Sequence, residues 1–224
     1  PKNAVDVVFD QLKRLEYRGY DSAGIAYRNN GEIKVVKRAG KLTELGKLLD
    51  EKPISAHMAI AHSRWATHGG PTDTNAHPHY DHFEQVAIIH NGIIENYATI
   101  KQELKKRGHE FRSDTDTEVL VHLIEDIYEN ANVDLDEAVR LALGEVIGAY
   151  AIVILSKEHP GELICARKGS PIVVGVGKES GEYFVASDAT PIIEYTNNVI
   201  YLNDGELALV RKGEITVKTI ENQV

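Results

Sequence analysis

Several features are scarce in this sequence, and each absence excludes a class of protein. One cysteine, Cys165, stands among 224 residues, so no intrachain disulfide forms, which fits a reducing compartment. No apolar run approaches the roughly 20 residues that a membrane-spanning helix needs, and no basic-plus-apolar leader opens the chain. Lys and Arg number 25 against 34 Asp and Glu, a formal net charge of -9 that repels phosphate backbones. We therefore expect a cytoplasmic protein with no nucleic-acid and no membrane partner.

The residues that are present suit one globular domain with helices and sheets. Hydrophobic residues make up 42% of the chain, and no repeat, linker or low-complexity segment divides residues 1–224. Apolar spacing predicts helices over 5–15, 42–49, 97–107, 115–128 and 135–143. Strands are expected at 22–28, 32–38 (after an Asn30-Gly31 turn), 57–62 and 85–94, and in seven short runs after Gly148. Residues 64–82 are polar and aperiodic, which predicts a long, functional loop.

The lone cysteine is the first candidate for a nucleophile. Cys165 lies in the apolar segment "LICARK", and an activated thiolate needs a partly exposed, electropositive setting. A free cysteine in such a strand is usually a small core residue. The sequence therefore predicts that Cys165 packs in the interior and takes no part in catalysis.

The segment "HPHYDH", residues 77–82, raises the possibility of zinc. It matches the HxHxDH pattern of metallo-β-lactamase-type zinc hydrolases, and two imidazoles and a carboxylate this close are suitable ligands. However, "TDTNA" precedes it where that pattern needs an apolar strand, and although His122 is available as a distant ligand, nothing around it resembles a second ligand cluster. Polar loop histidines are the favoured interpretation, and a zinc-dependent hydrolase stays as an alternative.

The segment "HSRWATHGG" follows a predicted strand and contains Arg64, Trp65, Thr67 and His68. A guanidinium suits bidentate capture of a carboxylate, and the hydroxyl and backbone donors of the loop complete such a cradle. The alternative is a surface loop with one stacked tryptophan.

Two further segments carry polar groups at special positions. Asn91 and Gly92 in "IIHNGIIEN" are expected to break a buried strand, where a side-chain NH2 and an accessible backbone N–H form an oxyanion hole; the alternative is an Asn-Gly turn. Thr115 and Glu118 have the spacing of a capping box, which places Asp116 in a helix's first turn. Asp116 suits a substrate ammonium group, although the helix dipole also favours an acid there.

Taken together, the motifs resemble one family. "KRLEYRGYDSAG" is followed by "HSRWATHGGP", "NAHPH", "HNGIIEN", "SDTDTEV", "GSP" and "ASD". Over essentially the whole chain this series closely resembles the glutaminase domain of glutamine–fructose-6-phosphate aminotransferases, which are class II glutamine amidotransferases. The resemblance implies an α+β, N-terminal-nucleophile hydrolase fold: a four-layer α/β/β/α sandwich with two mainly antiparallel sheets.

The resemblance also implies an activity. In such enzymes an N-terminal cysteine attacks the side-chain amide of L-glutamine, with its own α-amine as general base. The ammonia passes to C-terminal sugar-phosphate isomerase domains, which convert fructose 6-phosphate to glucosamine 6-phosphate. The resemblance implies a homodimer at full length, no metal and no organic cofactor.

Roles for individual residues follow from the same resemblance. Asn91 and Gly92 would stabilise the oxyanion, and Asp116 would bind the α-ammonium group of glutamine. Arg64 would bind its α-carboxylate, and Trp65 would help to close the site. Thr67 and His68 would complete the loop, and Arg18 and His77 would shape the pocket.

The chain departs from the family at its start. It opens with "PKNAVDVV", which matches the region after the strand that carries the nucleophilic cysteine. Pro1 has neither thiol nor hydroxyl. We therefore expect a fragment without its nucleophile and without isomerase domains, which binds parts of glutamine but does not hydrolyse it. A non-catalytic glutamine-binding or regulatory domain is a second alternative.

Overall fold

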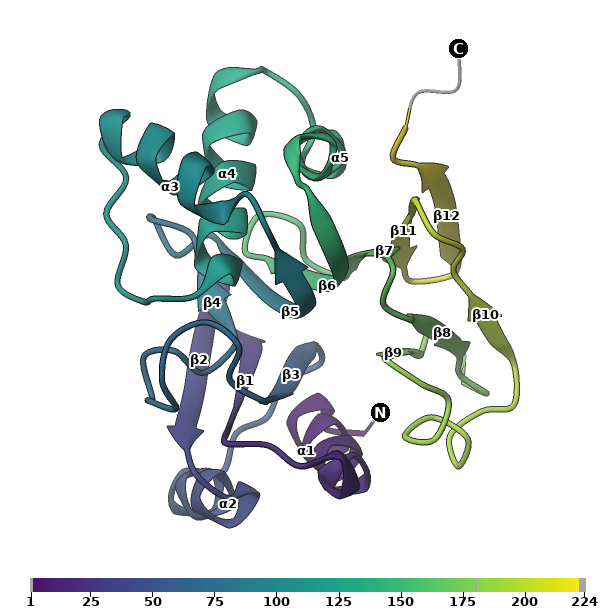
Figure 1. The fold of residues 1–224 in the computed structure, drawn as a ribbon. Helices are drawn as coiled ribbons and strands as arrows, with labels where there is room; N and C mark the ends of the chain where they lie inside the picture. The colour runs from purple at the N-terminus through teal and green to yellow at the C-terminus, as the bar shows by residue number, and fades with distance from the viewer. Residues whose placement is uncertain (1, 180, 222–224) are drawn as a thin grey trace.

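The computed structural model describes residues 2–179 and 181–221 of the chain (Figure 1). The helices are α1 (Ala4–Arg14), the 3-10 helix η1 (Glu16–Arg18), α2 (Leu42–Glu51), α3 (Tyr97–Lys106), α4 (Asp116–Asn130) and α5 (Leu135–Glu145). The first strands are β1 (Ser22–Asn29), β2 (Glu32–Ala39), β3 (Ala59–Arg64), β4 (His79–Tyr80), β5 (Val86–Ile94) and β6 (Gly148–Ser156). The later strands are β7 (Glu162–Lys168), β8 (Val173–Val176), β9 (Tyr183–Ala186), β10 (Val199–Tyr201), β11 (Glu206–Arg211) and β12 (Glu214–Thr219).

One layer is a six-stranded sheet in the order β12-β11-β7-β6-β5-β4, with every neighbouring pair antiparallel. Its outer face is covered by α4 and α5, and α3 packs against α4 (Figure 1). The apolar stripes of these helices bury Leu120, Ile124 and Val139 against Ile152 and Ile154 of β6. Burial of each such side chain contributes about 1.5–3 kcal/mol to the free energy of folding. This part of the core therefore stabilises the packing of α4 and α5 on the six-stranded sheet.

The second layer consists of two three-stranded antiparallel sheets, β2-β1-β3 and β10-β8-β9. Helices α1 and α2 pack on the first of them. A core cluster joins this layer to the six-stranded sheet, with Ala26 and Ile60 on one side and Val153, Cys165 and Ala208 on the other. The predicted α+β, four-layer α/β/β/α sandwich is therefore confirmed, with one difference. Where a single second sheet was expected, the described residues form two separate sheets.

The two strand edges that line the division, those of β3 and β9, have no partner among the described residues. Strand β3 is the last strand of β2-β1-β3, and β9 is the last strand of β10-β8-β9. Unpaired strand edges present rows of N–H and C=O groups that a further strand can pair with. Lys2, the first described residue, has its ammonium group 4.6 Å from the centroid of the Tyr195 ring, so the start of α1 lies beside the segment between β9 and β10.

Local structure follows the sequence closely, with two corrections. The β1–β2 hairpin turns at Asn30 and Gly31, with φ of 51° and 82°, the left-handed conformations of a type I′ turn. The long loop contains one short strand that was not predicted, β4. The expected break at Asn91-Gly92 is wrong, because β5 runs through both residues and stays paired with β6 to Ile94.

Cys165 lies on β7 and is completely buried, between Val153 of β6 and Ala208 of β11. Burial raises the pKa of its thiol to about 12, so almost no thiolate exists at neutral pH. The predicted packing role is consistent with this setting. Among the described residues, no helix is long and apolar enough to cross a membrane.

Candidate functional site

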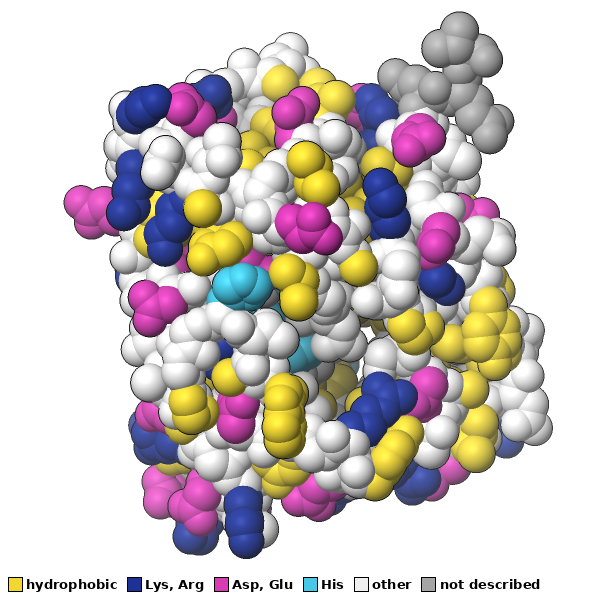
Figure 2. Space-filling view, viewed as in Figure 1, with side chains coloured by type: hydrophobic (Ala, Val, Ile, Leu, Met, Phe, Trp, Pro, Cys, Tyr) yellow, Lys and Arg dark blue, Asp and Glu magenta, His cyan; other side chains and the backbone are white. Residues whose placement is uncertain are grey.

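A cavity of about 770 Å3 lies where the second layer is divided. Strand β3 lines one side of it and β9 the other, while α1 and the inward faces of β6, β7 and β11 supply further walls. The surface is hollowed at the centre of one face, and imidazole side chains are visible there (Figure 2). The cavity thus runs between the two unpaired strand edges and the six-stranded sheet.

The fold brings most of the predicted site residues to this cavity, although they are far apart in the sequence. One of them, His68, is not part of the wall: its ring packs against Tyr97, with ring centroids 4.9 Å apart. The wall contains Arg18, Arg64, Trp65, Thr67, His77, Asn91, Gly92 and Asp116.

The backbone N–H of Gly92 points away from β6. In an antiparallel pair, residues alternate between those that bond to the partner strand and those that do not. Two backbone hydrogen bonds of 2.8 Å, Glu95 N to Ile147 O and Lys157 N to Gln85 O, continue the register of β5 and β6. They show that the odd-numbered residues of β5 are the ones that hydrogen-bond to β6. The N–H groups of His90 and Ile94 accordingly bond elsewhere, to His77 Nδ1 (3.4 Å) and Asp116 Oδ2 (2.8 Å). The Gly92 N–H lies between these two on the same edge.

Only glycine fits at position 92. Its φ is 126°, and a Cβ there would lie 2.1 Å from the carbonyl oxygen of Ala149. Any side chain would push β5 away from β6 and move the neighbouring Asn91. The glycine therefore keeps this part of the strand both continuous and open to the cavity.

Asn91 is held by a histidine from the opposite layer. His62 Nε2 lies 2.8 Å from Asn91 Oδ1, a hydrogen bond that crosses the interior from β3 to β5. Burial lowers the pKa of His62 to about 4, so the ring is neutral at pH 7. Because an amide oxygen only accepts, Nε2 carries the proton and donates it. The Asn91 amide is thereby fixed through its oxygen, and its NH2 group is left to donate elsewhere.

Arg64 is buried at the end of β3 and organises the loop that follows it. Its guanidinium donates to the carbonyl oxygens of Gly70 and Gly69 (3.1 Å each) and of His68. Burial lowers its pKa, and the nearby carboxylates of Asp21 and Asp116 oppose that shift. A guanidinium has five N–H groups, so the loop carbonyls use part of its donor set. The predicted carboxylate-binding role remains a prediction.

Asp116 is the first residue of α4 and is buried. Thr115 caps the helix by accepting from Glu118 N (3.3 Å), as predicted. The reciprocal half of the capping box does not form, because the Glu118 carboxylate accepts from Arg112 N (2.8 Å) and Ser113 N (2.7 Å) instead. The helix N-terminus stabilises the negative charge of Asp116, which lies within the electrostatic reach of Arg64.

Trp65 and Arg18 lie at the rim. The indole is 69% exposed, and its ring would be 3.0 Å from a Cβ placed on Gly19, so the two chain segments touch. Arg18 pairs with Asp188 and donates to Ser187 Oγ (2.9 Å), both just after β9. These contacts connect the end of η1 to the far side of the cavity.

The histidines of "HPHYDH" do not converge on one metal. His77 is buried and stacks on His62, with ring centroids 4.2 Å apart. His79 is also buried, with Nε2 3.1 Å from Thr115 Oγ1. His82 instead faces His109 and His122, with centroids 6.2 and 6.3 Å away. The described residues therefore do not support a zinc hydrolase built on this segment.

Three residues that the motifs did not single out also shape the site. His90 Nδ1 lies 2.9 Å from Thr117 Oγ1 at the cavity wall. Lys37 donates to the carbonyls of Thr74, Ala76 and Pro78, which fixes the segment around His77. The third is His62, and the inward-facing alternation Ile60, His62, Arg64 on β3 was a signal that could have found it.

The family model of the glutamine amidotransferase domain matches residues 62–194, more than half of the chain. The chain belongs to this family. The amidotransferase domain is 56% identical over 223 residues to the glutamine–fructose-6-phosphate aminotransferase (isomerizing) of Bacteroides thetaiotaomicron. It is 50% identical to enzymes of the same name from Thermus thermophilus and Pyrococcus horikoshii, over 222 residues each. These alignments cover 98–99% of this chain but only 36% of each relative.

Solved structures show the same fold. The amidotransferase domain superposes with a TM-score of 0.84 on the glutamine phosphoribosylpyrophosphate amidotransferase of B. subtilis, at 24% identity, covering 100% of this chain and 48% of that one. A class II glutamine aminotransferase domain protein from Silicibacter pomeroyi gives a TM-score of 0.64 at 12% identity, over 90% and 92% of the two chains. The N-terminal-nucleophile hydrolase fold that the resemblance implied is therefore confirmed.

Proposed function

We propose that residues 1–224 form the glutaminase domain of a glutamine–fructose-6-phosphate aminotransferase. The domain hydrolyses L-glutamine and supplies ammonia to C-terminal isomerase domains, which form glucosamine 6-phosphate from fructose 6-phosphate. The longer protein acts as a cytoplasmic homodimer, and its glutaminase chemistry needs no metal or organic cofactor. Support comes from the relatives of that name, which align with nearly all of this chain over 36% of their own length.

The observation that carries the proposal is the position of the cavity. It lies between the unpaired edges of β3 and β9, directly opposite Asn91 and Gly92. A strand placed there would pair with both edges and turn two three-stranded sheets into one continuous layer. Strand β3 has six residues, so its edge is about 20 Å long. We assign this place to a strand that precedes Pro1 in the longer protein and begins with the nucleophilic cysteine.

In this arrangement the cysteine Sγ attacks the side-chain carbonyl carbon of glutamine, and the α-amine of the same residue takes the thiol proton. The oxyanion of the tetrahedral intermediate accepts hydrogen bonds from Asn91 Nδ2 and the Gly92 N–H. Collapse breaks the C–N bond, and the α-ammonium returns the proton to the departing amine, which leaves as ammonia. Water then cleaves the thioester to release glutamate and the free thiol.

His62 has a positioning role in this mechanism. Its hydrogen bond to Asn91 Oδ1 turns the amide so that Nδ2 donates toward the cavity. A neutral ring suits this task because its single N–H is used on Asn91, and burial keeps the ring neutral by lowering its pKa.

Recognition of glutamine as an amino acid requires one group of each charge. Asp116 offers a buried carboxylate for the α-ammonium, and Arg64 offers a guanidinium for the α-carboxylate. Two opposite charges at a fixed separation select an amino-acid zwitterion over a simple amide. Thr67 and the loop that Arg64 holds complete this end of the cavity.

The test measures glutamate release and glucosamine 6-phosphate formation by the full-length protein and by its leading Cys→Ala variant. We expect both activities in the first and neither in the second, and no hydrolysis by a polypeptide that begins at Pro1. Glutamine binding without turnover in the protein with its full N-terminus would favour the non-catalytic alternative. Hydrolysis by the polypeptide that begins at Pro1 would contradict the assigned nucleophile.

A further inference from the structure

A second cluster of histidines lies outside the cavity, around α4. His109, in the segment between α3 and α4, faces His122 and Glu125 on α4, and none of the three lines the cavity. One ligand atom from each lies within 4.8 Å of the other two. His122 and Glu125 are buried, and their spacing of three residues places them on the same helix face.

The distances suit a small metal ion. His109 Nδ1 lies 3.1 Å from His122 Nδ1 and 3.6 Å from Glu125 Oε2. Ligands at about 2.0–2.1 Å from a tetrahedral zinc ion are about 3.3 Å from each other. The two separations from His109 are within a few tenths of an ångström of this value, and the ligand atoms of His122 and Glu125 lie within 4.8 Å of each other, so side-chain rotation brings all three atoms to one ion.

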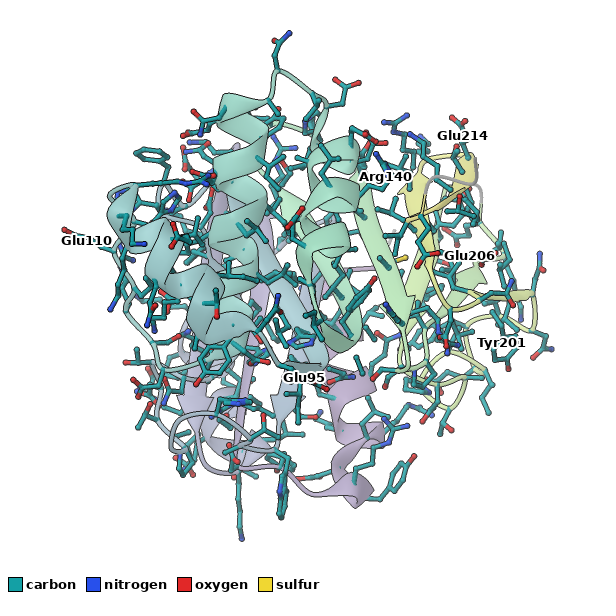
Figure 3. All side chains as sticks on the ribbon, turned by 45° about the horizontal axis from the view of Figure 1, so that its top comes forward. Glu95, Glu110, Arg140, Tyr201, Glu206 and Glu214 are labelled. Carbon is teal, nitrogen blue, oxygen red and sulfur yellow. The ribbon has the colours of Figure 1, made fainter. Side chains whose placement is uncertain are left out.

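The other nitrogen of each imidazole faces a carboxylate. His109 Nε2 lies 3.4 Å from Asp126 Oδ1, and His122 Nε2 lies 3.9 Å from Glu118 Oε1. A carboxylate behind a zinc-binding imidazole usually fixes the tautomer that leaves the other nitrogen free, and Asp126 is placed to do so for His109. Glu118 is too far from His122 Nε2 for a hydrogen bond and contributes a nearby negative charge. Glu125 is held as well, since its oxygens accept from His82 N (2.9 Å) and Phe83 N (3.2 Å). The neighbouring Glu110 extends away from the molecule (Figure 3) and takes no part.

We propose that His109 Nδ1, His122 Nδ1 and Glu125 bind a divalent transition metal, with Zn2+ as the best match to two imidazoles and one carboxylate. The ion connects the segment after α3 to the middle of α4. Because Glu125 also holds residues 82–83, the ion stabilises the helical layer behind β5. The site is structural and differs from the zinc hydrolase centre that "HPHYDH" suggested.

The experiment uses full-length protein without a polyhistidine tag, stripped of metal by a chelator. Zn2+ is titrated against a competing chromophoric chelator. We expect one equivalent to bind, and His109→Asn, His122→Asn and Glu125→Gln each to lower the affinity by at least about 100-fold. The control His57→Asn changes an exposed histidine away from the cluster and leaves the affinity unchanged.

A second measurement guards against misfolding of the ligand variants. Asp126→Asn keeps all three ligands but removes the carboxylate behind His109, so the affinity falls about 10–100-fold while circular dichroism stays unchanged. Co2+ bound by the wild type gives the visible absorption bands of a tetrahedral complex, and Glu125→Gln loses them. If the wild type binds no Zn2+, or binds it no more tightly than the three ligand variants do, the proposal is wrong.

Discussion

The unbroken sheet β12-β11-β7-β6-β5-β4 and the divided layer opposite it differ in the side chains that they turn toward the interior. On its central strands β6 and β7, the unbroken sheet presents Ile152 and Ile154 to the helices and Val153 and Cys165 to the other layer, all of them buried and without charge. The divided layer carries His62 and Arg64 on β3, beside a cavity of about 770 Å3.

The difference separates stability from function in this fold. Buried aliphatic side chains in a continuous sheet contribute most of the free energy of folding, whereas buried histidines and an arginine cost desolvation energy. Asn91 and Gly92 lie at the boundary, on a strand of the unbroken sheet that faces the divided layer. A rigid strand thus holds the two groups that we propose as oxyanion donors, and both line the cavity.

The largest effect on activity is expected from a change at Asn91, at the boundary between the two layers. In the full-length enzyme, Asn91→Ala removes one of the two proposed oxyanion donors, so we expect kcat for glutamate release to fall about 10^2–10^3-fold. Folding changes little because the Asn91 side chain is exposed to the cavity. The matched control is Asn197→Ala, an exposed asparagine between β9 and β10. Equal loss of activity in both variants would contradict the oxyanion role.

The unbroken sheet is tested by Ile154→Ala on its central strand β6. Ile154 is 1% exposed, and removing its side chain costs about 2–5 kcal/mol through lost burial and a cavity. Amide hydrogen exchange of peptides from β5 to β7 reports this loss as a lower opening free energy. We expect turnover by the folded fraction to stay close to that of the wild type. A fall in kcat without loss of stability would show that the unbroken sheet also contributes directly to activity.

His62 of the divided layer predicts a dependence of stability on pH. His62 has a folded-state pKa of about 4, below its unfolded value near 6.5. The unfolded state therefore binds more protons between pH 6.5 and 4, and about 3 kcal/mol of stability is lost as the pH falls through that range. Denaturant unfolding of His62→Asn at both pH values should show a smaller loss than the wild type. His57→Asn, at an exposed position, should behave as the wild type does.

His62 also connects stability to activity. Loss of one hydrogen bond to Asn91 is worth about 1 kcal/mol, so His62→Phe lowers kcat about 5-fold while KM for glutamine stays nearly constant. A matching rise in KM with unchanged kcat would show that His62 shapes the binding pocket rather than the oxyanion hole.

The smallest effect is expected at Cys165. Cys165→Ala removes one buried sulfur from β7 and costs about 1 kcal/mol, and glutamate release is unchanged because the raised pKa keeps the thiol protonated at neutral pH. Urea unfolding and a glutaminase assay measure the two quantities. A large loss of activity with little loss of stability would make Cys165 a candidate nucleophile again.

The sequence predicted local structure well where local residues determine it. Asn30-Gly31 takes left-handed conformations, and Thr115 caps α4, because each depends on groups within a few residues. Asn91-Gly92 failed as a predicted break because pairing with β6, more than fifty residues away, keeps β5 extended. Tertiary contacts of this kind override the preference of an Asn-Gly pair for turns.

The residues of the candidate site were also predicted only where their roles do not depend on tertiary contacts. Arg64, Asn91 and Asp116 were predicted from motifs and reach one cavity. His62 was missed, since its role depends on a hydrogen bond from one layer to the other. The histidines of "HPHYDH" separate because the polypeptide turns after β4, so that His82 faces α4 while His77 and His79 face the interior. The spacing of the histidines in the sequence does not determine which side of the sheet each imidazole faces after such a turn.

The assignment of the nucleophile can be tested with an electrophilic glutamine analogue and the full-length enzyme. After inactivation, peptide mass spectrometry locates the covalent adduct. The arrangement of β3, β9, Asn91 and Gly92 predicts a single adduct on the sulfur of the N-terminal cysteine, prevented by excess glutamine. An adduct on Cys165, or inactivation that leaves the N-terminal cysteine unmodified, would contradict it.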